Sequence, residues 1–184
     1  MTDRRSVSER IVEHLTSAGE TIACAESLTA GLVSATIADT AGASVVLRGA
    51  IVAYAADVKV ALLGVPASVV AEAGTVNPRV ARAMAEGARL RLGATWGIST
   101  TGVAGPGPAE GKPAGTVHLA VAGPRGTVTR DLRLKGTRAD VRRAAAAAAL
   151  ALALEVATDS AASSDSPVPH DPAHDADGQT PAPS

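Results

Sequence analysis

Aromatic side chains are nearly absent from this sequence. They make up 1% of its 184 residues, there is no Phe, and Tyr54 and Trp96 are the only two. Proteins that bind single-stranded nucleic acid by stacking its bases need several aromatic rings, so the composition argues against that class. The hydrophobic content is nevertheless 46%. The core of a globular domain must therefore be built from Ala, Val, Leu and Ile.

Net charge, cysteine and long apolar runs are also scarce. The formal net charge of -1 gives no electrostatic drive toward nucleic acid or an anionic membrane, and we expect neither as a partner. The one cysteine, Cys24, excludes an intrachain disulfide and stands in an apolar stretch, which favours a buried thiol and a cytoplasmic location. The longest apolar run, 144–154, is shorter than the roughly 18 residues of a membrane span, and the polar N-terminus does not resemble a signal peptide.

The expected folded domain has no histidines or other metal ligands at a recognisable spacing. His14 and His118 fall within an expected helix and an expected strand, so a Ser-His-Asp triad has little support. Within the expected folded domain there is no cysteine pair, no His-x-x-x-His and no cluster of acids. His170 and His174 lie in a polar C-terminal segment without further ligands. We therefore expect no metal and no cofactor.

The order of apolar and turn-forming residues predicts one α/β domain. We expect a layered, mixed β-sheet flanked by helices, ending in a β-hairpin and a final helix. From Thr158 the composition changes to Ser, Asp, Pro, Ala and His, so we expect a folded domain over 1–157 and a disordered tail over 158–184. The expected helices are 7–18, 28–39, 56–63, a short one between Pro66 and Gly74, 78–92 and 138–156; the expected strands are 21–25, 47–54, 95–101, 117–121 and 127–134.

A serine stands where the first strand is expected to turn into a helix, in Ala25–Gly31 (AESLTAG). Free backbone N–H groups at such a junction can stabilise an oxyanion or bind a phosphate. Without a histidine, a serine nucleophile needs another base, and lysine is the usual substitute. If the first two strands are neighbours, Ser27 and Lys59 emerge at one edge of the sheet. The alternative is that Ser27 caps a helix and Lys59 is solvated; spacing alone leaves this open.

A long Gly/Pro segment, 102–113, separates the third strand from the hairpin, and loops of this length in compact domains are often functional. The hydroxyls of Thr100 and Thr101, just before it, either face a ligand or only form a turn. Three arginines at the start of the last helix, Arg138, Arg142 and Arg143, either hold an anion or form a solvated face. Their helical spacing favours the solvated face.

Five segments occur in an order that resembles a known family. They are 25–31, Tyr54–Lys59 with Leu62–Val65, Thr101–Pro106 (TGVAGP), Lys112–Val117 (KPAGTV), and Gly136–Arg138 with Arg142. The sequence resembles, over about residues 7–156, the C-terminal domain of the competence-damage-inducible CinA proteins, which is also found alone as nicotinamide-nucleotide amidase.

That resemblance implies a metal-independent amidohydrolase that deamidates nicotinamide mononucleotide to nicotinate mononucleotide and ammonia in pyridine nucleotide recycling. It implies Ser27 as the nucleophile and Lys59 as its base, with 1–157 as the amidase domain. We also expect a homo-oligomer, because small α/β enzymes are commonly symmetric assemblies. The positions at which the resemblance implies substrate contacts are Glu26, Leu28, Thr29, Tyr54, Thr101, Gly102, Gly105 and Arg138.

Two positions depart from the family's usual pattern. Ala30-Gly31 stands where Gly-Gly is common, and Ala55-Ala56 stands where Ser-Asn is common. A methyl group at Ala30 is expected to crowd a backbone that must approach the substrate, and the missing asparagine removes a hydrogen bond that would orient substrate or lysine. The alternatives are therefore a non-catalytic module that binds a nucleotide or protein in a competence or DNA-damage context, and an amidase with an altered substrate.

Overall fold

A five-stranded mixed sheet forms the centre of the molecule, in the order β2-β1-β3-β4-β5. The computed structural model describes residues 5–164. β1 pairs in parallel with β2 and with β3, whereas β3/β4 and β4/β5 are antiparallel. The predicted mixed sheet and C-terminal hairpin are thus confirmed. The strands are β1 (Ile22–Glu26), β2 (Leu47–Val52), β3 (Trp96–Gly102), β4 (Thr116–Gly123) and β5 (Gly126–Arg133).

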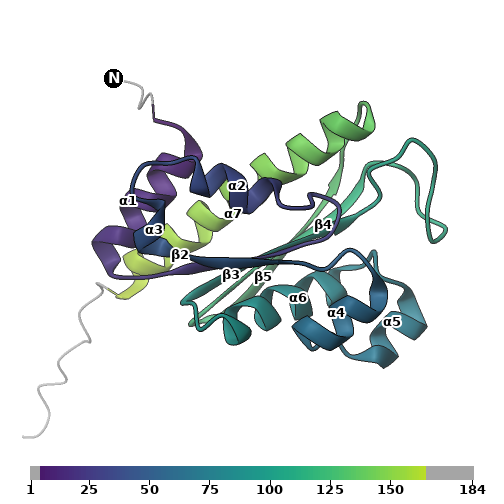
Figure 1. The fold of residues 1–184 in the computed structure, drawn as a ribbon, viewed down its shortest axis with the longest axis horizontal. Coiled ribbons are helices and arrows are strands. Elements are labelled where there is room, and N and C mark those ends of the chain that lie inside the picture. The colour runs from purple at the N-terminus through teal and green to yellow at the C-terminus, as the bar shows by residue number, and fades with distance from the viewer. Residues whose placement is uncertain (1–4, 165–184) are drawn as a thin grey trace, which may run out of the picture.

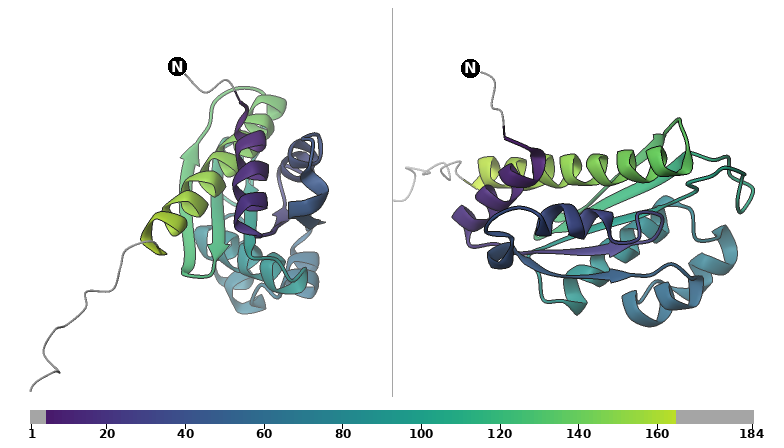
Figure 2. Two further views of the ribbon diagram at one scale, coloured as in Figure 1. Left: turned by 90° about the vertical axis from the view of Figure 1, so that its left-hand side faces the viewer. Right: turned by 45° about the horizontal axis from the view of Figure 1, so that its top comes forward.

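Helices cover both faces of this sheet (Figures 1 and 2). One face carries α1 (Val7–Ala18), α2 (Leu32–Ala38), α3 (Ala43–Val46) and α7 (Arg138–Ser164); the other carries α4 (Ala56–Leu63), α5 (Ala67–Ala73) and α6 (Pro78–Arg91). Every residue of β1 and β4 is buried, while the outermost strands β2 and β5 have exposed positions. Strands sandwiched between two helical layers must be apolar on both faces, which the Ala- and Val-rich sequence provides.

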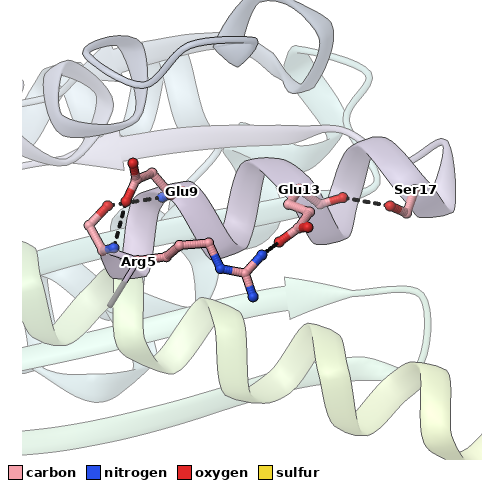
Figure 3. Close-up of polar contacts among 5 residues, drawn as sticks. Arg5, Glu9, Glu13 and Ser17 are labelled. Carbon is pink, nitrogen blue, oxygen red and sulfur yellow. Dashed lines mark hydrogen bonds and ion pairs between the residues drawn. The ribbon is translucent and has the colours of Figure 1, made fainter. Parts of the chain in front are cut away.

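Helix ends follow the expected signals. Ser6 caps α1: its side chain accepts from the Glu9 N–H, and the Glu9 carboxylate accepts from the Ser6 N–H (Figure 3). Figure 3 also shows the ion pair of Arg5 with Glu13 on the outer face of this helix. Asn77 caps α6 through its side chain, with Pro78 at the first helical position. The predicted boundaries of these helices are confirmed to within a residue or two.

The helix expected over 28–39 begins later, at Leu32. Residues 28–31 form a turn, in which Ala30 has φ 50° and Gly31 has φ 97°. Both values lie in the left-handed region, which a right-handed helix cannot include. The sequence pattern also missed the short helix α3. Its four residues are too few to show a helical period.

The last helix is longer than expected, since α7 runs from Arg138 to Ser164 rather than to Val156. Residues 158–164, which the composition assigned to the tail, are therefore helical. Ala157 is buried, and the Thr158 hydroxyl donates to the carbonyls of Leu154 and Glu155. The rest of the expected tail, including His170 and His174, lies outside the described residues. Over the described range, no helix is both long enough and apolar enough to cross a membrane.

Candidate active site

Three parallel strands end at the same edge of the sheet, and the candidate catalytic groups stand there. Ser27 directly follows β1, and its N–H donates to Thr100 O of β3 at 3.0 Å. Ala53 follows β2, and its N–H donates to Glu26 O at 2.9 Å. The ladder thus continues one residue beyond each strand. Because β1 lies between β2 and β3, this edge is the place where ligands bind in open α/β sheets.

Lys59 and Ser27 are in direct contact. Lys59 Nζ lies 3.1 Å from Ser27 Oγ, 2.8 Å from Ala53 O and 3.0 Å from Tyr54 O. The lysine is 1% exposed, and Ser27 is 8% exposed. These three partners satisfy an ammonium group completely. They equally suit a neutral amine, which donates twice to the carbonyls and accepts from the Ser27 hydroxyl. The predicted contact between Ser27 and Lys59 is present.

Burial lowers the pKa of Lys59 from its ordinary value of 10.5, while the negative charge of Glu110 acts in the opposite direction. Removing an amine from water disfavours its charged form, because the interior solvates the ammonium less well than water does. A lysine that loses its proton more readily is better suited to act as a base near neutral pH. Its position on the first turns of α4, next to the end of β2, is what buries it.

A cavity of about 350 Å³ opens in front of Ser27. Its walls come from the residues after β1 and β2, from the segment before α6, from the Gly/Pro loop after β3, and from the start of α7. Among the described residues no three His, Cys, Asp or Glu side chains gather as a metal-binding cluster. The lining includes Ser27, Leu28, Tyr54, Thr75, Glu110 and Arg138.

Arg142 of α7 holds the turn after Ser27. Its Nε donates to Leu28 O at 3.0 Å, and its Nη2 donates to Thr29 O at 2.9 Å. A peptide N–H points opposite to the carbonyl of the same peptide, so this contact turns the Thr29 N–H away from α7. Within residues 5–164, neither the Leu28 N–H nor the Thr29 N–H donates to a protein acceptor. Two backbone donors without a protein acceptor therefore follow Ser27 directly in the chain, and Leu28 also lines the cavity.

The structure gives Glu26 a different role from the expected one. One carboxylate oxygen accepts from the N–H groups of Gly31 and Val33, at 2.8 and 3.1 Å. The other accepts from the Ser34 N–H and hydroxyl, at 2.9 and 2.8 Å. Glu26 is 1% exposed and does not line the cavity. It caps the N-terminus of α2, so that helix end is not available to a substrate.

The other expected site residues divide into two groups. Leu28, Tyr54, Gly102, Gly105 and Arg138 line the cavity with Ser27. The Arg138 guanidinium donates to Gly105 O and to Tyr54 Oη, at 2.9 and 2.7 Å. Thr29 and Thr101 are fully buried, and their hydroxyls contact Thr100 Oγ1 and Thr75 O. Neither of these two residues lines the cavity.

Several residues of the site were missed. Glu110 reaches across to Thr75 and Val76, 35 and 34 positions away in sequence, and no local pattern signals such a contact. Arg142 was expected on a solvated face but binds carbonyls of the Ser27 turn, whereas Arg143 pairs with Asp140 at the surface. Ala30, expected to crowd the substrate, is exposed and does not line the cavity.

A family model described as the CinA C-terminal domain matches residues 4–157. The chain belongs to this family. A CinA-like protein of Frankia casuarinae is 54% identical over 122 residues, which are 66% of this chain and 28% of that protein. A putative competence-damage inducible protein of Desulforamulus reducens is 45% identical over 140 residues, 76% of this chain and 34% of that protein. The chain thus spans about a third of these relatives.

Solved structures of the same family share the fold. The competence/damage inducible protein CihA of Agrobacterium tumefaciens superposes with a TM-score of 0.79 at 32% identity, covering 86% of this chain and 99% of that one. A CinA superfamily protein of Klebsiella pneumoniae gives 0.80 at 27% identity, covering 83% and 96%. The mixed sheet with its flanking helices is therefore the family's fold.

Proposed function

We propose that this domain is a nicotinamide-nucleotide amidase that releases ammonia from nicotinamide mononucleotide through Ser27 and Lys59. One observation carries the proposal. A buried lysine amine, with its pKa lowered by desolvation, lies 3.1 Å from a serine hydroxyl at the wall of a cavity. A nucleophile within hydrogen-bond reach of its base is the arrangement that activates serine when histidine is absent.

The first step forms an acyl-enzyme. Neutral Lys59 Nζ takes the proton of Ser27 Oγ as the oxygen attacks the carboxamide carbon. The carbonyl π electrons move onto the oxygen, and in this proposal the N–H groups of Leu28 and Thr29, which have no protein acceptor, stabilise the resulting oxyanion. Lys59 then passes its proton to the amide nitrogen, the C–N bond breaks, and ammonia leaves.

The second step hydrolyses the acyl-enzyme. Lys59, neutral again, takes a proton from a water molecule that attacks the ester carbon. The C–O bond to Ser27 breaks, and the proton returns to Ser27 Oγ, so the net reaction converts amide and water into carboxylate and ammonium. Ala53 O and Tyr54 O hold Nζ in place throughout, because both remain hydrogen-bond acceptors for either form of the amine.

The cavity suits a small polar molecule with an anionic group. Its volume of about 350 Å³ lies in the lower part of the range for small-molecule sites. The Arg138 guanidinium donates two hydrogen bonds, to Gly105 O and to Tyr54 Oη. A guanidinium has five N–H donors, so others remain for a phosphate.

The test is ammonia release from nicotinamide mononucleotide by wild type, Ser27→Ala and Lys59→Met. Both variants should lose at least about 10³-fold in kcat while keeping the circular dichroism of the fold. Ser17→Ala and Lys135→Met are matched controls, because Ser17 is exposed on α1 and Lys135 lies in the exposed connection before α7, and both should keep wild-type rates.

The competing functions give other outcomes. A binding module would release no ammonia from any carboxamide, and Lys59→Met would still bind nucleotide. An amidase with an altered substrate would release ammonia from a different carboxamide and lose that activity in Ser27→Ala. Undiminished activity in Ser27→Ala would remove the serine from the mechanism.

A further inference from the structure

A glutamate occupies an unfavourable backbone conformation in the Gly/Pro loop. Ala109 and Lys112 exchange two backbone hydrogen bonds, of 3.0 and 2.9 Å, which close a two-residue turn. The two residues inside it, Glu110 and Gly111, have φ of 50° and 69°. Such a turn favours Asn, Asp or Gly at both positions. A glutamate kept in a left-handed conformation must be held by interactions elsewhere.

Those interactions lie across the cavity. One carboxylate oxygen of Glu110 accepts from the N–H groups of Thr75 and Val76, at 2.7 and 3.1 Å, and the other accepts from Thr75 Oγ1 at 2.6 Å. Thr75 O in turn accepts from the hydroxyl of Thr101, at the end of β3, at 2.9 Å. Glu110 therefore holds the peptides on both sides of Thr75, and Thr101 of β3 also holds the second of them.

The two joined segments are walls of the same cavity. Thr75 and Val76 form one side, and the loop from Gly102 to Glu110 forms another. The backbone before Thr75 leaves room for the carboxylate only because residue 74 is glycine. A Cβ at Gly74 would lie 2.3 Å from a Glu110 oxygen, and Gly74 itself has φ +73°. The absence of a side chain at Gly74 therefore allows Glu110 of the Gly/Pro loop to make this contact.

Glu110 is ionised at neutral pH. Partial burial acts to raise the pKa of its carboxyl, but the hydrogen bonds from Thr75 and Val76 outweigh burial and lower the pKa below the ordinary 4.5. A charged carboxylate accepts stronger hydrogen bonds than a neutral group does. The contact therefore persists over the pH range in which Lys59 acts as a base.

We infer that Glu110 is a positioning residue, which joins the Gly/Pro loop to residues 75–76 and so sets the shape of the substrate cavity. It touches neither Ser27 nor Lys59 in the described contacts. Its charge acts on the pKa of Lys59 from a distance, whereas its hydrogen bonds act on the cavity wall and so on substrate binding. This inference rests on the proposed function, because it assigns the cavity to the amidase substrate.

Two substitutions at this position separate hydrogen bonding from charge. In Glu110→Gln the carbonyl oxygen can accept from the N–H groups of Thr75 and Val76, and the amide nitrogen can donate to Thr75 Oγ1, since a hydroxyl also accepts. All three contacts survive without the charge. Glu110→Gly removes the side chain and also relieves the left-handed backbone, so a loss of activity there cannot come from turn strain.

For Glu110→Gly we expect KM to rise about tenfold while kcat stays within about twofold of wild type. Losing interactions that the substrate and the transition state share raises KM without lowering kcat. Glu110→Gln should stay within about twofold of wild type in both. Glu72→Ala is the matched control, because Glu72 is an exposed carboxylate on α5 that pairs with Arg79 rather than with the loop. Wild-type KM in Glu110→Gly would overturn the inference. The inference would also be overturned if Glu110→Gln and Glu110→Gly lost activity equally and both shifted the pH profile. The effect would then come from the charge of Glu110 acting on Lys59.

Amide hydrogen exchange gives a readout that needs no activity. The N–H groups of Thr75 and Val76 should exchange at least about tenfold faster in Glu110→Gly than in wild type, and at nearly wild-type rates in Glu110→Gln. Unchanged exchange in the glycine variant would overturn the inference even if the domain were inactive. An inactive wild type with the expected exchange pattern would instead refute only the proposed function.

Discussion

Glu26→Gln is expected to destabilise the domain strongly, although only one oxygen is exchanged for nitrogen. Four donors face the carboxylate: the N–H groups of Gly31, Val33 and Ser34, and the Ser34 hydroxyl. The glutamine carbonyl can serve Gly31 and Val33, and the Ser34 hydroxyl can turn to Gly31 O, its second partner at 3.1 Å, and accept from the new amide. The Ser34 N–H is then left facing an N–H₂ group.

The magnitude follows from that one loss. A buried donor deprived of a charged acceptor costs about 1.5–3 kcal/mol, and removing a negative charge from a helix N-terminus adds about 0.3–2 kcal/mol, reduced by the lower cost of burying a neutral side chain. We expect a loss of about 2–4 kcal/mol in the free energy of unfolding, or about 4–16 °C in Tm for a chain of this size.

Urea and thermal unfolding followed by circular dichroism measure both quantities. Glu13→Gln is the matched control, because Glu13 is exposed on α1 and pairs with Arg5 (Figure 3). It should change the free energy of unfolding by less than about 0.5 kcal/mol. If Glu26→Gln also stayed within about 0.5 kcal/mol of wild type, the capping role assigned to Glu26 would be wrong.

Three further predictions concern stability and pH. Ala55 caps α4 with suitable angles, φ -84° and ψ 157°, but without a side-chain hydrogen bond, so Ala55→Ser should stabilise by about 1 kcal/mol in urea unfolding. Ala30→Gly should stabilise by about 0.5–1 kcal/mol on the same assay, because the left-handed cost at φ 50° exceeds the entropy that glycine adds to the unfolded chain. Burial lowers the pKa of Lys59 from 10.5, so kcat/KM should rise with pH to a plateau with its midpoint below 10.5. In the same window the unfolded chain binds a proton on Lys59 that the native state lacks, so the free energy of unfolding of wild type should rise with pH relative to that of Lys59→Met.

The elements that the sequence predicted well carry their own local signals. α1 and α6 begin at side-chain caps, and α1 ends at a left-handed glycine. The hairpin of β4 and β5 alternates as expected for an outer strand paired with a buried one. The error at α2 has a physical cause. Leu28 keeps the helical spacing, yet Ala30 adopts a conformation that alanine seldom takes, and it does so because Arg142 and Glu26 hold the neighbouring peptides.

The site was predictable only in part, for a similar reason. Ser27 and Lys59 each follow a strand, and neighbouring parallel strands bring them together. The spacing alone therefore indicated that the two residues could lie at the same edge of the sheet. The contacts of Glu110 with Thr75, and of Arg142 with Leu28, join segments 35 and 114 positions apart. Such pairs depend on how α7 and the Gly/Pro loop lie over the sheet, which no local period encodes.

We therefore expect the two departures from the family's pattern to act on stability more than on chemistry. Ala30 is exposed beyond the turn, and Ala55 and Ala56 are exposed at the start of α4; none of the three lines the cavity. The groups that hold Lys59 Nζ are the Ser27 hydroxyl and the backbone carbonyls of Ala53 and Tyr54. A carbonyl is supplied by any residue, so replacing Ser-Asn by Ala-Ala leaves this part of the site intact. What the replacement removes is a cap on the helix that carries Lys59, and the expected gain from Ala55→Ser measures that loss separately from turnover.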